Sequence, residues 1–389
     1  MTEIAHGAVV VLPGEAILSR WWRTLDKVVL FAVVLLFAFG ILLGLAASVP
    51  LAERNGLPAF HYVQRQAIFG SMAFVVMLVV SAMSPQLVRR LAVMGFLGAA
   101  LALMFLPVLG TDFGKGATRW YSLGFASIQP SEFLKPLFVI VTAWLMASAA
   151  EPNGPPGKSI SFAILVIIIG FLAMQPDFGQ AMLTIVAWSA VYFVAGAPIF
   201  LLTAVVLTVG AAGALAYGKS EHFARRIDGF LSPDVDPRTQ MGYAIDAIRE
   251  GGFFGTGVNE GRVKWTLPDA HTDFIIAVAA EEYGMIMVLC IIALFAIITF
   301  RCLMRLCVER DVFIRLAGTG LTVLLASQAF INLGVAVRIL PAKGMTLPFV
   351  SYGGSSLIAM GLLMGCLLCF TRVRPQAEIG DHLLSNGFR

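Results

Sequence analysis

The chain has 389 residues, of which 59% are hydrophobic and only 13% are charged. Because soluble domains carry roughly 25% charged residues, this composition excludes an ordinary soluble protein and indicates one that is embedded in a lipid bilayer. The formal net charge is only +4 and the sequence has no run of Lys and Arg, so a nucleic-acid-binding protein is excluded as well.

Apolar segments of membrane-spanning length follow one another along the chain. A transmembrane helix needs about 20 apolar residues, and such segments lie near residues 27–49, 66–83, 90–109, 131–149, 159–175, 178–196, 199–217, 274–301, 313–337 and 354–371. The first segment is too long for the core of a signal peptide and no cleavage site follows it, so we expect it to remain as an anchor. The sequence therefore predicts an all-α polytopic membrane protein with about ten transmembrane helices.

We expect one transmembrane domain, residues 26–375, between two tails, residues 1–25 and 376–389. With the N-terminus in the cytoplasm, most Lys and Arg residues of the short loops lie inside, as the positive-inside rule requires. Both tails are then cytoplasmic, and one large loop, about 218–273, lies on the outer side. Within this loop, residues 240–249 have the pattern of a short amphipathic helix.

Charged residues stand around the start of the fourth span. Each ionisable group inside a span costs about 2.5–3.5 kcal/mol, so it needs a partner or a function. Glu132 and Lys135 are three residues apart, a spacing that lets them pair on one helix face. Arg119 is a planar cation with several donors, which suits a pyrophosphate group; the alternative is a contact with lipid phosphates at the membrane surface.

Asp273 closes the large outer loop and opens the eighth span. A carboxylate at this position either caps the N-terminus of the helix or serves a chemical function, and position alone favours neither. At about 100° per residue, Glu281 lies about 80° from Asp273 around the helix, whereas Glu282 lies almost opposite. Glu281 is therefore the better candidate to share a cavity with Asp273. Pairing with a buried cation or hydroxyl of another helix is at least as well supported for either glutamate.

The stretch 332–356 interrupts two membrane-length apolar segments with prolines, glycines, a lysine and hydroxyl residues. Irregular polar backbone at membrane depth is stable only where protein or a water-filled cavity satisfies its N–H and C=O groups. Arg338 and Lys343 place two cations here, on the outer side. Small residues allow a substrate to approach the backbone closely, or else serve tight helix packing; these are Ser351, Gly353 and Gly354.

This stretch resembles the signature of the SEDS family (shape, elongation, division and sporulation), whose polytopic proteins polymerise the peptidoglycan precursor lipid II. The motifs that match in order and spacing are Arg338-Ile-Leu-Pro341, Lys343-Gly344 and Leu347-Pro348-Phe349-Val350-Ser351-Tyr352-Gly353-Gly354-Ser355. Within the family, the run Lys343-Gly344-Met345-Thr346 resembles the division branch more than the elongation branch. The resemblance extends from about Asp26 to Pro375 and implies a ten-span fold.

The resemblance also implies which residues form the site. Carried over by position, the family's proposed catalytic aspartate is Asp273, and Asp269 and His271 become loop residues that shape or hydrate the site. The motif 129–135 lines the central cavity in the family, which favours a role for Glu132 and Lys135 in handling the substrate or cations.

The implied activity is an inverting glycosyl transfer at the outer leaflet. Asp273 accepts the proton of the acceptor sugar's 4-hydroxyl, and general-base assistance of this kind contributes about 10²–10⁴-fold. Positive charge for the leaving pyrophosphate comes from Arg119, Arg338, Lys343 or a divalent ion such as Mg²⁺ or Mn²⁺. No ligand set for such an ion follows from the spacing of residues, and ATP is not required.

We expect the protein to act on lipid II among the lipids of the bacterial inner membrane, at the division septum. Its expected partners are a class B penicillin-binding protein and other divisome proteins. Two other functions stay open, namely a flippase that moves lipid II across the bilayer and a non-catalytic scaffold of the divisome. A flippase needs polar groups through the full depth of the membrane, whereas here they gather toward the outer side, which favours the polymerase.

Overall fold

The computed structural model of the protein describes residues 17–111, 118–124, 126–219, 221–232, 239–267, 269–341 and 344–373. Among the predicted site residues, Lys343 lies outside this part of the chain. The predicted C-terminal tail, 376–389, lies outside it as well.

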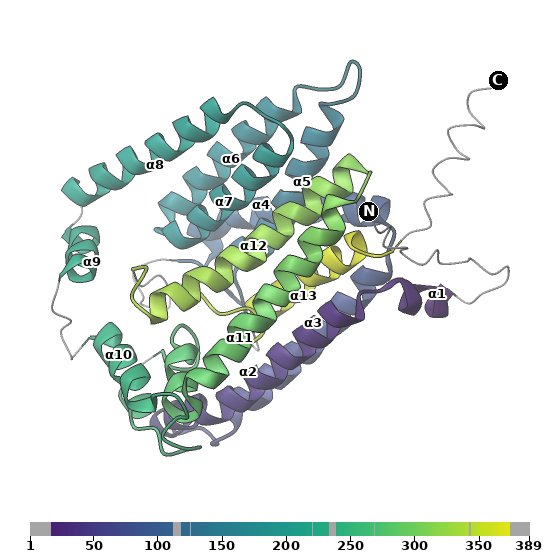
Figure 1. The fold of residues 1–389 in the computed structure, drawn as a ribbon. Coiled ribbons are helices and arrows are strands. Elements are labelled where there is room, and N and C mark those ends of the chain that lie inside the picture. Colours follow the sequence, from purple (N-terminus) through teal and green to yellow (C-terminus); the bar gives the residue numbers. More distant parts are fainter. Residues whose placement is uncertain are drawn as a thin grey trace, which may run out of the picture.

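Ten apolar helices form the bundle in this part of the chain (Figure 1). Eight are long and apolar enough to cross a membrane: α2 (Lys27–Arg54), α3 (His61–Ala82), α4 (Pro85–Leu109), α5 (Pro130–Ser148), α6 (Gly157–Met174), α8 (Ile199–Lys219), α11 (Ile275–Cys307) and α12 (Val312–Ala336). The two others, α7 (Phe178–Val194) and α13 (Gly354–Phe370), are apolar but shorter, with 17 residues each. The predicted all-α fold with about ten transmembrane helices is confirmed.

Helix α4 begins earlier than the apolar segment from which it was predicted. Its first residue is Pro85, and the hydroxyl of Ser84 accepts a hydrogen bond from the backbone N–H of Leu87 at 3.3 Å. A serine cap followed by proline at the first helical position is a strong start signal. The serine hydroxyl accepts a bond from a backbone N–H that has no partner within the helix, and proline has no N–H to leave unpaired. The prediction counted apolar residues only and therefore left out this polar first turn.

The described part of the long loop between α8 and α11 has three helical segments. It contains α9 (Glu221–Leu231), α10 (Gln240–Gly251) and a short 3-10 helix, η1 (Val263–Trp265). The helix expected at 240–249 is confirmed as α10. The remaining elements are α1 (Ile17–Thr24) and a two-stranded antiparallel hairpin ahead of α5, β1 (Tyr121–Ser122) and β2 (Ser127–Ile128).

Helix α12 lies in the middle of the bundle, in contact with α5, α7, α11 and α13 (Figure 1). Helices α5 and α12 are buried over most of their spans, whereas α8 stands at the edge with its apolar window exposed. Lipid tails cannot hydrogen-bond with a side chain, so polar groups at membrane depth have to be placed on the buried helices. The buried helices α5 and α12 can therefore carry polar side chains, whereas the apolar window of α8 is exposed.

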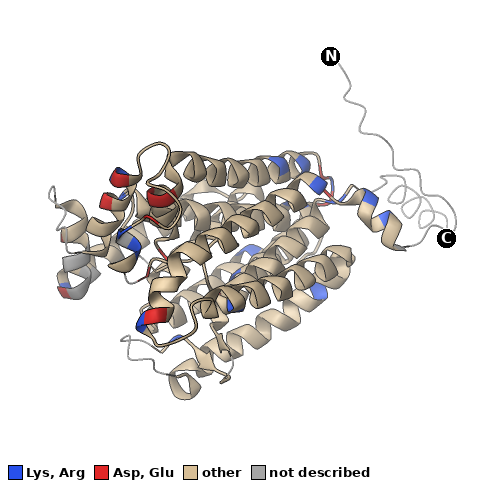
Figure 2. Cartoon of the chain, turned by 90° about the horizontal axis from the view of Figure 1, so that it is seen from below, with Lys and Arg blue, Asp and Glu red and all other residues tan. Residues whose placement is uncertain are grey.

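Charged residues concentrate near the two ends of the helices. Figure 2 shows that most Asp and Glu residues gather at the end of the molecule away from the two chain termini. At the end near the termini, Asp26 caps α2 and pairs with Arg301 and Arg305 of α11, each at 2.8 Å. Arg305 also donates to the carbonyl of Thr371 at 2.9 Å. The buried carboxylate of Asp26 thus joins α2 to α11 by binding both arginines, and the bond from Arg305 to Thr371 adds the end of α13.

Close packing of α10 against α11 depends on a residue without a side chain. A Cβ atom at Gly251 would collide with the backbone carbonyl of Ala280. We expect Gly251→Ala to destabilise the protein by about 1–3 kcal/mol, the usual cost of overpacking a site that cannot yield. Thermal unfolding in detergent measures this, with Gly98→Ala on α4 as the control because nothing lies within 4 Å of that position. Equal melting temperatures for the two variants would contradict the expectation.

Candidate active site around Asp273

Asp273 lies in a tight turn just before α11. The carbonyl of Asp269 accepts hydrogen bonds from the backbone N–H groups of Thr272, Asp273 and Phe274 at 3.1 to 3.3 Å. Phe274 occupies the N-cap position of α11 and makes no side-chain cap. The turn, rather than a side chain at the helix terminus, thus holds the backbone of Asp273.

The signature stretch packs against this turn. The backbone N–H of Tyr352 donates to the carbonyl of His271 at 3.0 Å, and the Ser351 hydroxyl donates to the carbonyl of Thr272 at 2.6 Å. The rings of His271 and Tyr352 are also in contact, with centroids 5.6 Å apart. Ser351 and Tyr352 of the signature stretch therefore support the turn that carries Asp273.

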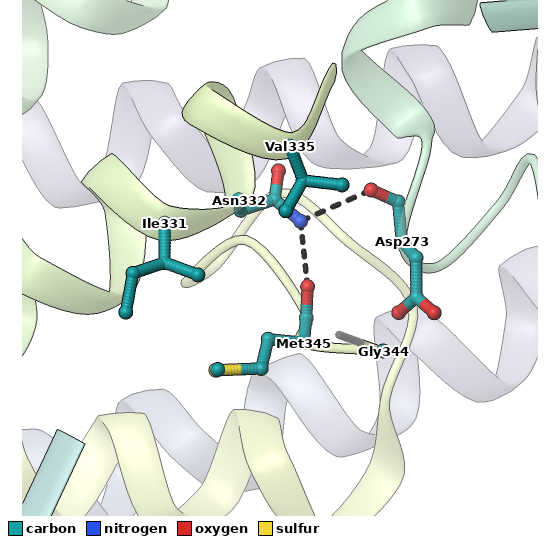
Figure 3. A pocket seen from close by; sticks show the side chains of 6 residues that line it. All are labelled: Asp273, Ile331, Asn332, Val335, Gly344 and Met345. Carbon is teal, nitrogen blue, oxygen red and sulfur yellow. Dashed lines mark hydrogen bonds between the residues drawn. The ribbon is translucent and has the colours of Figure 1, made fainter. Parts of the chain in front are cut away.

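The carboxylate of Asp273 faces Gly344, in the middle of the signature stretch (Figure 3). A Cβ atom at Gly344 would lie 3.4 Å from Asp273 Oδ2, and the backbone there has φ = +63°, a conformation that favours glycine. A small pocket of about 10 Å³, room for about one water molecule, is lined by Asp273, Ile331, Asn332, Val335, Gly344 and Met345. The fold thus brings the two separate motifs singled out in the sequence to one place.

Glu132 and Lys135 form the ion pair that their spacing allows. Lys135 Nζ lies 3.0 Å from Glu132 Oε2, and both side chains are almost completely buried. Gln180 of α7 donates to the other oxygen of Glu132 at 2.5 Å, and Lys135 donates to Gln328 Oε1 of α12 at 3.3 Å. The pair therefore joins α5, α7 and α12 through a buried polar network.

A second polar group lies where α6 ends and α7 begins. Arg119 donates to the carbonyls of Gln175 and Pro176 at 3.1 and 2.8 Å. Gln129, next to the start of α5, donates to the carboxylate of Asp177 at 3.1 Å. Arg119 thus binds the free carbonyls that follow α6, a common role for cations at helix C-termini.

Arg338 lies away from the pocket. Its guanidinium donates to the carbonyls of Phe230, at 3.1 Å, and of Gly229 and Ser232, which end α9. The residue has φ = +58° and therefore turns the chain sharply after α12. In this arrangement Arg338 fastens α9 to the start of the signature stretch.

Glu281 and Glu282 hold the loop between α10 and α11 against α11. Glu281 Oε1 accepts from the backbone N–H of Arg262 at 2.5 Å. Glu282 pairs with Lys264 at 2.6 Å and accepts from the backbone N–H of Asn259 at 3.1 Å. Neither glutamate lines the small pocket at Asp273. For Glu282, the structure shows the pairing with a buried cation that the sequence left open.

Gly353 and Gly354 pack closely against neighbouring side chains. A Cβ atom at Gly353 would lie 3.3 Å from Thr346 Cγ2, and one at Gly354 would lie 3.2 Å from the ring of Phe69. A side chain at either position would therefore crowd a neighbouring residue.

Sequence reasoning missed two buried amides of α12, Gln328 and Asn332. A signal existed, because an amide inside an apolar segment costs free energy unless it is hydrogen-bonded. The sequence assigned no ligand set to a divalent ion. Within the residues that the structure describes, no group of three or more His, Cys, Asp or Glu side chains lies together as a metal site would require, so no ligand set is assigned to Mg²⁺ or Mn²⁺.

Comparisons with known proteins agree with this architecture. A family model described as "Cell cycle protein", covering FtsW, RodA and SpoVE, matches residues 26–375. The chain is 42% identical to a probable peptidoglycan glycosyltransferase FtsW of Caulobacter vibrioides over 92% of both chains. It is 36% identical to the protein of the same name from Trichlorobacter lovleyi, over 88% of this chain and 92% of that one.

Two solved structures share the fold. One, described as "Structural coordination of polymerization and crosslinking by a peptidoglycan synthase complex", matches with a TM-score of 0.73 and 25% identity, over 90% of this chain and 98% of that one. The other, the rod shape determining protein RodA of Thermus thermophilus, matches with a TM-score of 0.64 and 24% identity, over 90% and 97%. With its bundle of apolar helices and this match over residues 26–375, the chain is an integral membrane protein of the FtsW/RodA/SpoVE family.

Proposed function

We propose that the protein is a peptidoglycan glycosyltransferase that polymerises lipid II at the outer leaflet during septal wall synthesis. The observation that carries the proposal is the placement of the Asp273 carboxylate against Gly344, where the two densest motifs of the sequence meet. The names of the FtsW relatives support the reaction class. The distribution of Lys and Arg supports the outer location of this end of the bundle.

In the proposed reaction, Asp273 is the general base. It accepts the proton of the 4-hydroxyl on the acceptor's N-acetylglucosamine, and that oxygen forms a bond to the anomeric carbon of the donor's N-acetylmuramic acid. The bond from this carbon to the pyrophosphate oxygen breaks, with inversion, and undecaprenyl pyrophosphate leaves. Arg119, half-buried near the start of α5, is the described cation best suited to balance the leaving charge.

A class B penicillin-binding protein is the proposed partner, because a strand that has been polymerised must then be cross-linked. The peptidoglycan synthase complex that shares this fold couples polymerisation with cross-linking, which supports such an assembly. The run of residues that ends at Thr346 resembles the division branch, so we propose that the pair works at the septum.

The test is polymerisation of labelled lipid II by the purified protein, with and without the penicillin-binding protein of the same organism. Reactions run with Mg²⁺ or Mn²⁺, then with a chelator, and we expect glycan ladders on a gel. No ladder under any condition, together with movement of labelled lipid II across vesicles that hold the protein, would replace the proposal with the flippase. Loss of ladders with the chelator alone would add a metal to the mechanism.

A further inference from the structure

Two amide side chains on α12 face the Asp273 site from inside the bundle. Gln328 and Asn332 are four residues apart, so they project about 40° from each other and one helical turn apart. Both are buried, with 1% and 2% of their surface exposed. A buried amide without partners costs free energy, so the bonds that these two make explain their presence.

Asn332 joins the Asp273 turn to the signature stretch. Its Nδ2 donates to the carbonyl of Asp273 at 3.1 Å and to the carbonyl of Met345 at 2.6 Å (Figure 3). Both partners are acceptors, so the amide can have only this orientation. One NH₂ group therefore sets the spacing between two chain segments that are distant in sequence.

The other half of the Asn332 amide shows what this side chain contributes. Its Oδ1 is buried and has no hydrogen-bond partner among the described residues. An unbonded buried acceptor costs about 1–3 kcal/mol. An apolar residue of the same shape would avoid this cost, so the asparagine contributes through the two bonds that it donates.

Gln328 repeats the contact one turn earlier. Its Nε2 donates to the carbonyl of Thr346 at 3.1 Å, and its Oε1 accepts from Lys135 at 3.3 Å. The ammonium group of Lys135 and the carbonyl of Thr346 fix the orientation of this amide too. The buried pair of Glu132 and Lys135 thus connects to the loop at Gly344 through a single side chain.

We propose that Asn332 and Gln328 are positioning residues, which clamp the backbone of Asp273 and the loop at 344–346 onto α12. This proposal rests on the glycosyltransferase function proposed above. The carboxylate of Asp273 and the loop that faces it are then held at a constant separation while substrate binds. A displacement of about 1 Å at a catalytic group can cost about 10²-fold in rate, so loss of either clamp lowers the rate without removing any group that touches substrate.

The decisive variant is Asn332→Leu, which keeps a similar side-chain shape and removes both donated bonds. We expect kcat for lipid II polymerisation to fall by about 10- to 100-fold. Gln328→Met is the second variant, with the same expected direction. The control is Thr322→Val, because Thr322 is equally buried on α12 but its hydroxyl donates to the carbonyl of Gly318 in its own helix. We expect kcat of this control to equal that of the wild type.

A double-mutant cycle separates positioning from a general loss of folded protein. If Asn332 acts through Asp273, Asn332→Leu lowers kcat in the wild type but adds little in an Asp273→Asn background. An equal loss in both backgrounds would overturn the proposal, and so would full activity of Asn332→Leu.

Hydrogen exchange of the backbone amides provides a readout that needs no activity. We expect exchange at residues 344–352 to be faster in Asn332→Leu and Gln328→Met than in the wild type, and unchanged in Thr322→Val. Unchanged exchange in the first two variants overturns the clamp. If the wild type forms no glycan ladder, the function proposed above fails, and the exchange rates still decide the clamp by itself.

Discussion

Asp273→Asn is expected to lower the rate of lipid II polymerisation by about 10²–10⁴-fold while the protein stays folded. The amide has the same shape as the carboxylate but cannot accept the proton of the attacking hydroxyl. The turn around Asp273 is held by the carbonyl of Asp269, the backbone N–H of Tyr352 and the hydroxyl of Ser351. None of these bonds involves the Asp273 side chain, so the substitution leaves them in place.

The matched control is Glu250→Gln, the same chemical change on an exposed carboxylate at the end of α10. Glycan ladders from the wild type and the control, with none from Asp273→Asn at equal melting temperature, would establish the base. Ladders of equal intensity from all three proteins would remove Asp273 from the chemistry and leave the enzyme intact.

Lys135→Met is expected to destabilise the protein by about 3–5 kcal/mol. The change removes the ammonium group from Glu132, whose carboxylate is almost completely buried, and an uncompensated buried charge is among the most costly defects in a protein. The double variant with Glu132→Gln removes that charge and should recover most of the lost stability, since a neutral amide can still bond with Gln180.

Thermal unfolding in detergent measures these differences. The control is Lys158→Met near the start of α6, which should change stability by no more than about 0.5 kcal/mol because this lysine is only half-buried. A Lys135→Met protein as stable as the wild type would show that the pair is not needed for folding. Polymerisation by the recovered double variant then tests whether the pair also handles substrate, and normal activity would limit the pair to folding.

Several features of the site follow from local patterns. The spacing of Glu132 and Lys135 predicts their pairing, because residues three apart share a helix face. The position of Asp273 at the start of a span predicts a carboxylate at the beginning of a helix, and the structure places it immediately before the N-cap of α11. These predictions succeed because they depend on neighbours within one helical turn.

Other features depend on contacts between distant segments. The guanidinium of Arg338 donates to the carbonyl of Phe230 in α9, more than 100 residues earlier in the chain, and no local pattern predicts this contact. The role of Arg338 toward the substrate stays a prediction. Glu281 was the better candidate to share the Asp273 cavity, and its carboxylate bonds instead to the backbone of Arg262. A helical wheel gives the direction of a side chain but not which loop covers that face.

Composition and the lengths of apolar segments were sufficient to predict a bundle of about ten membrane helices, because the bilayer imposes one length and one hydrogen-bonding rule on every span. Tertiary packing was needed to show that Asp273 meets Gly344 and that Asn332 ties both segments to α12. The physical reason is that a buried amide can form a hydrogen bond with any acceptor close to it in space, however far away that acceptor lies in the sequence. Its partners are chosen by the fold, which brings residues 273, 332 and 345 within reach of one NH₂ group.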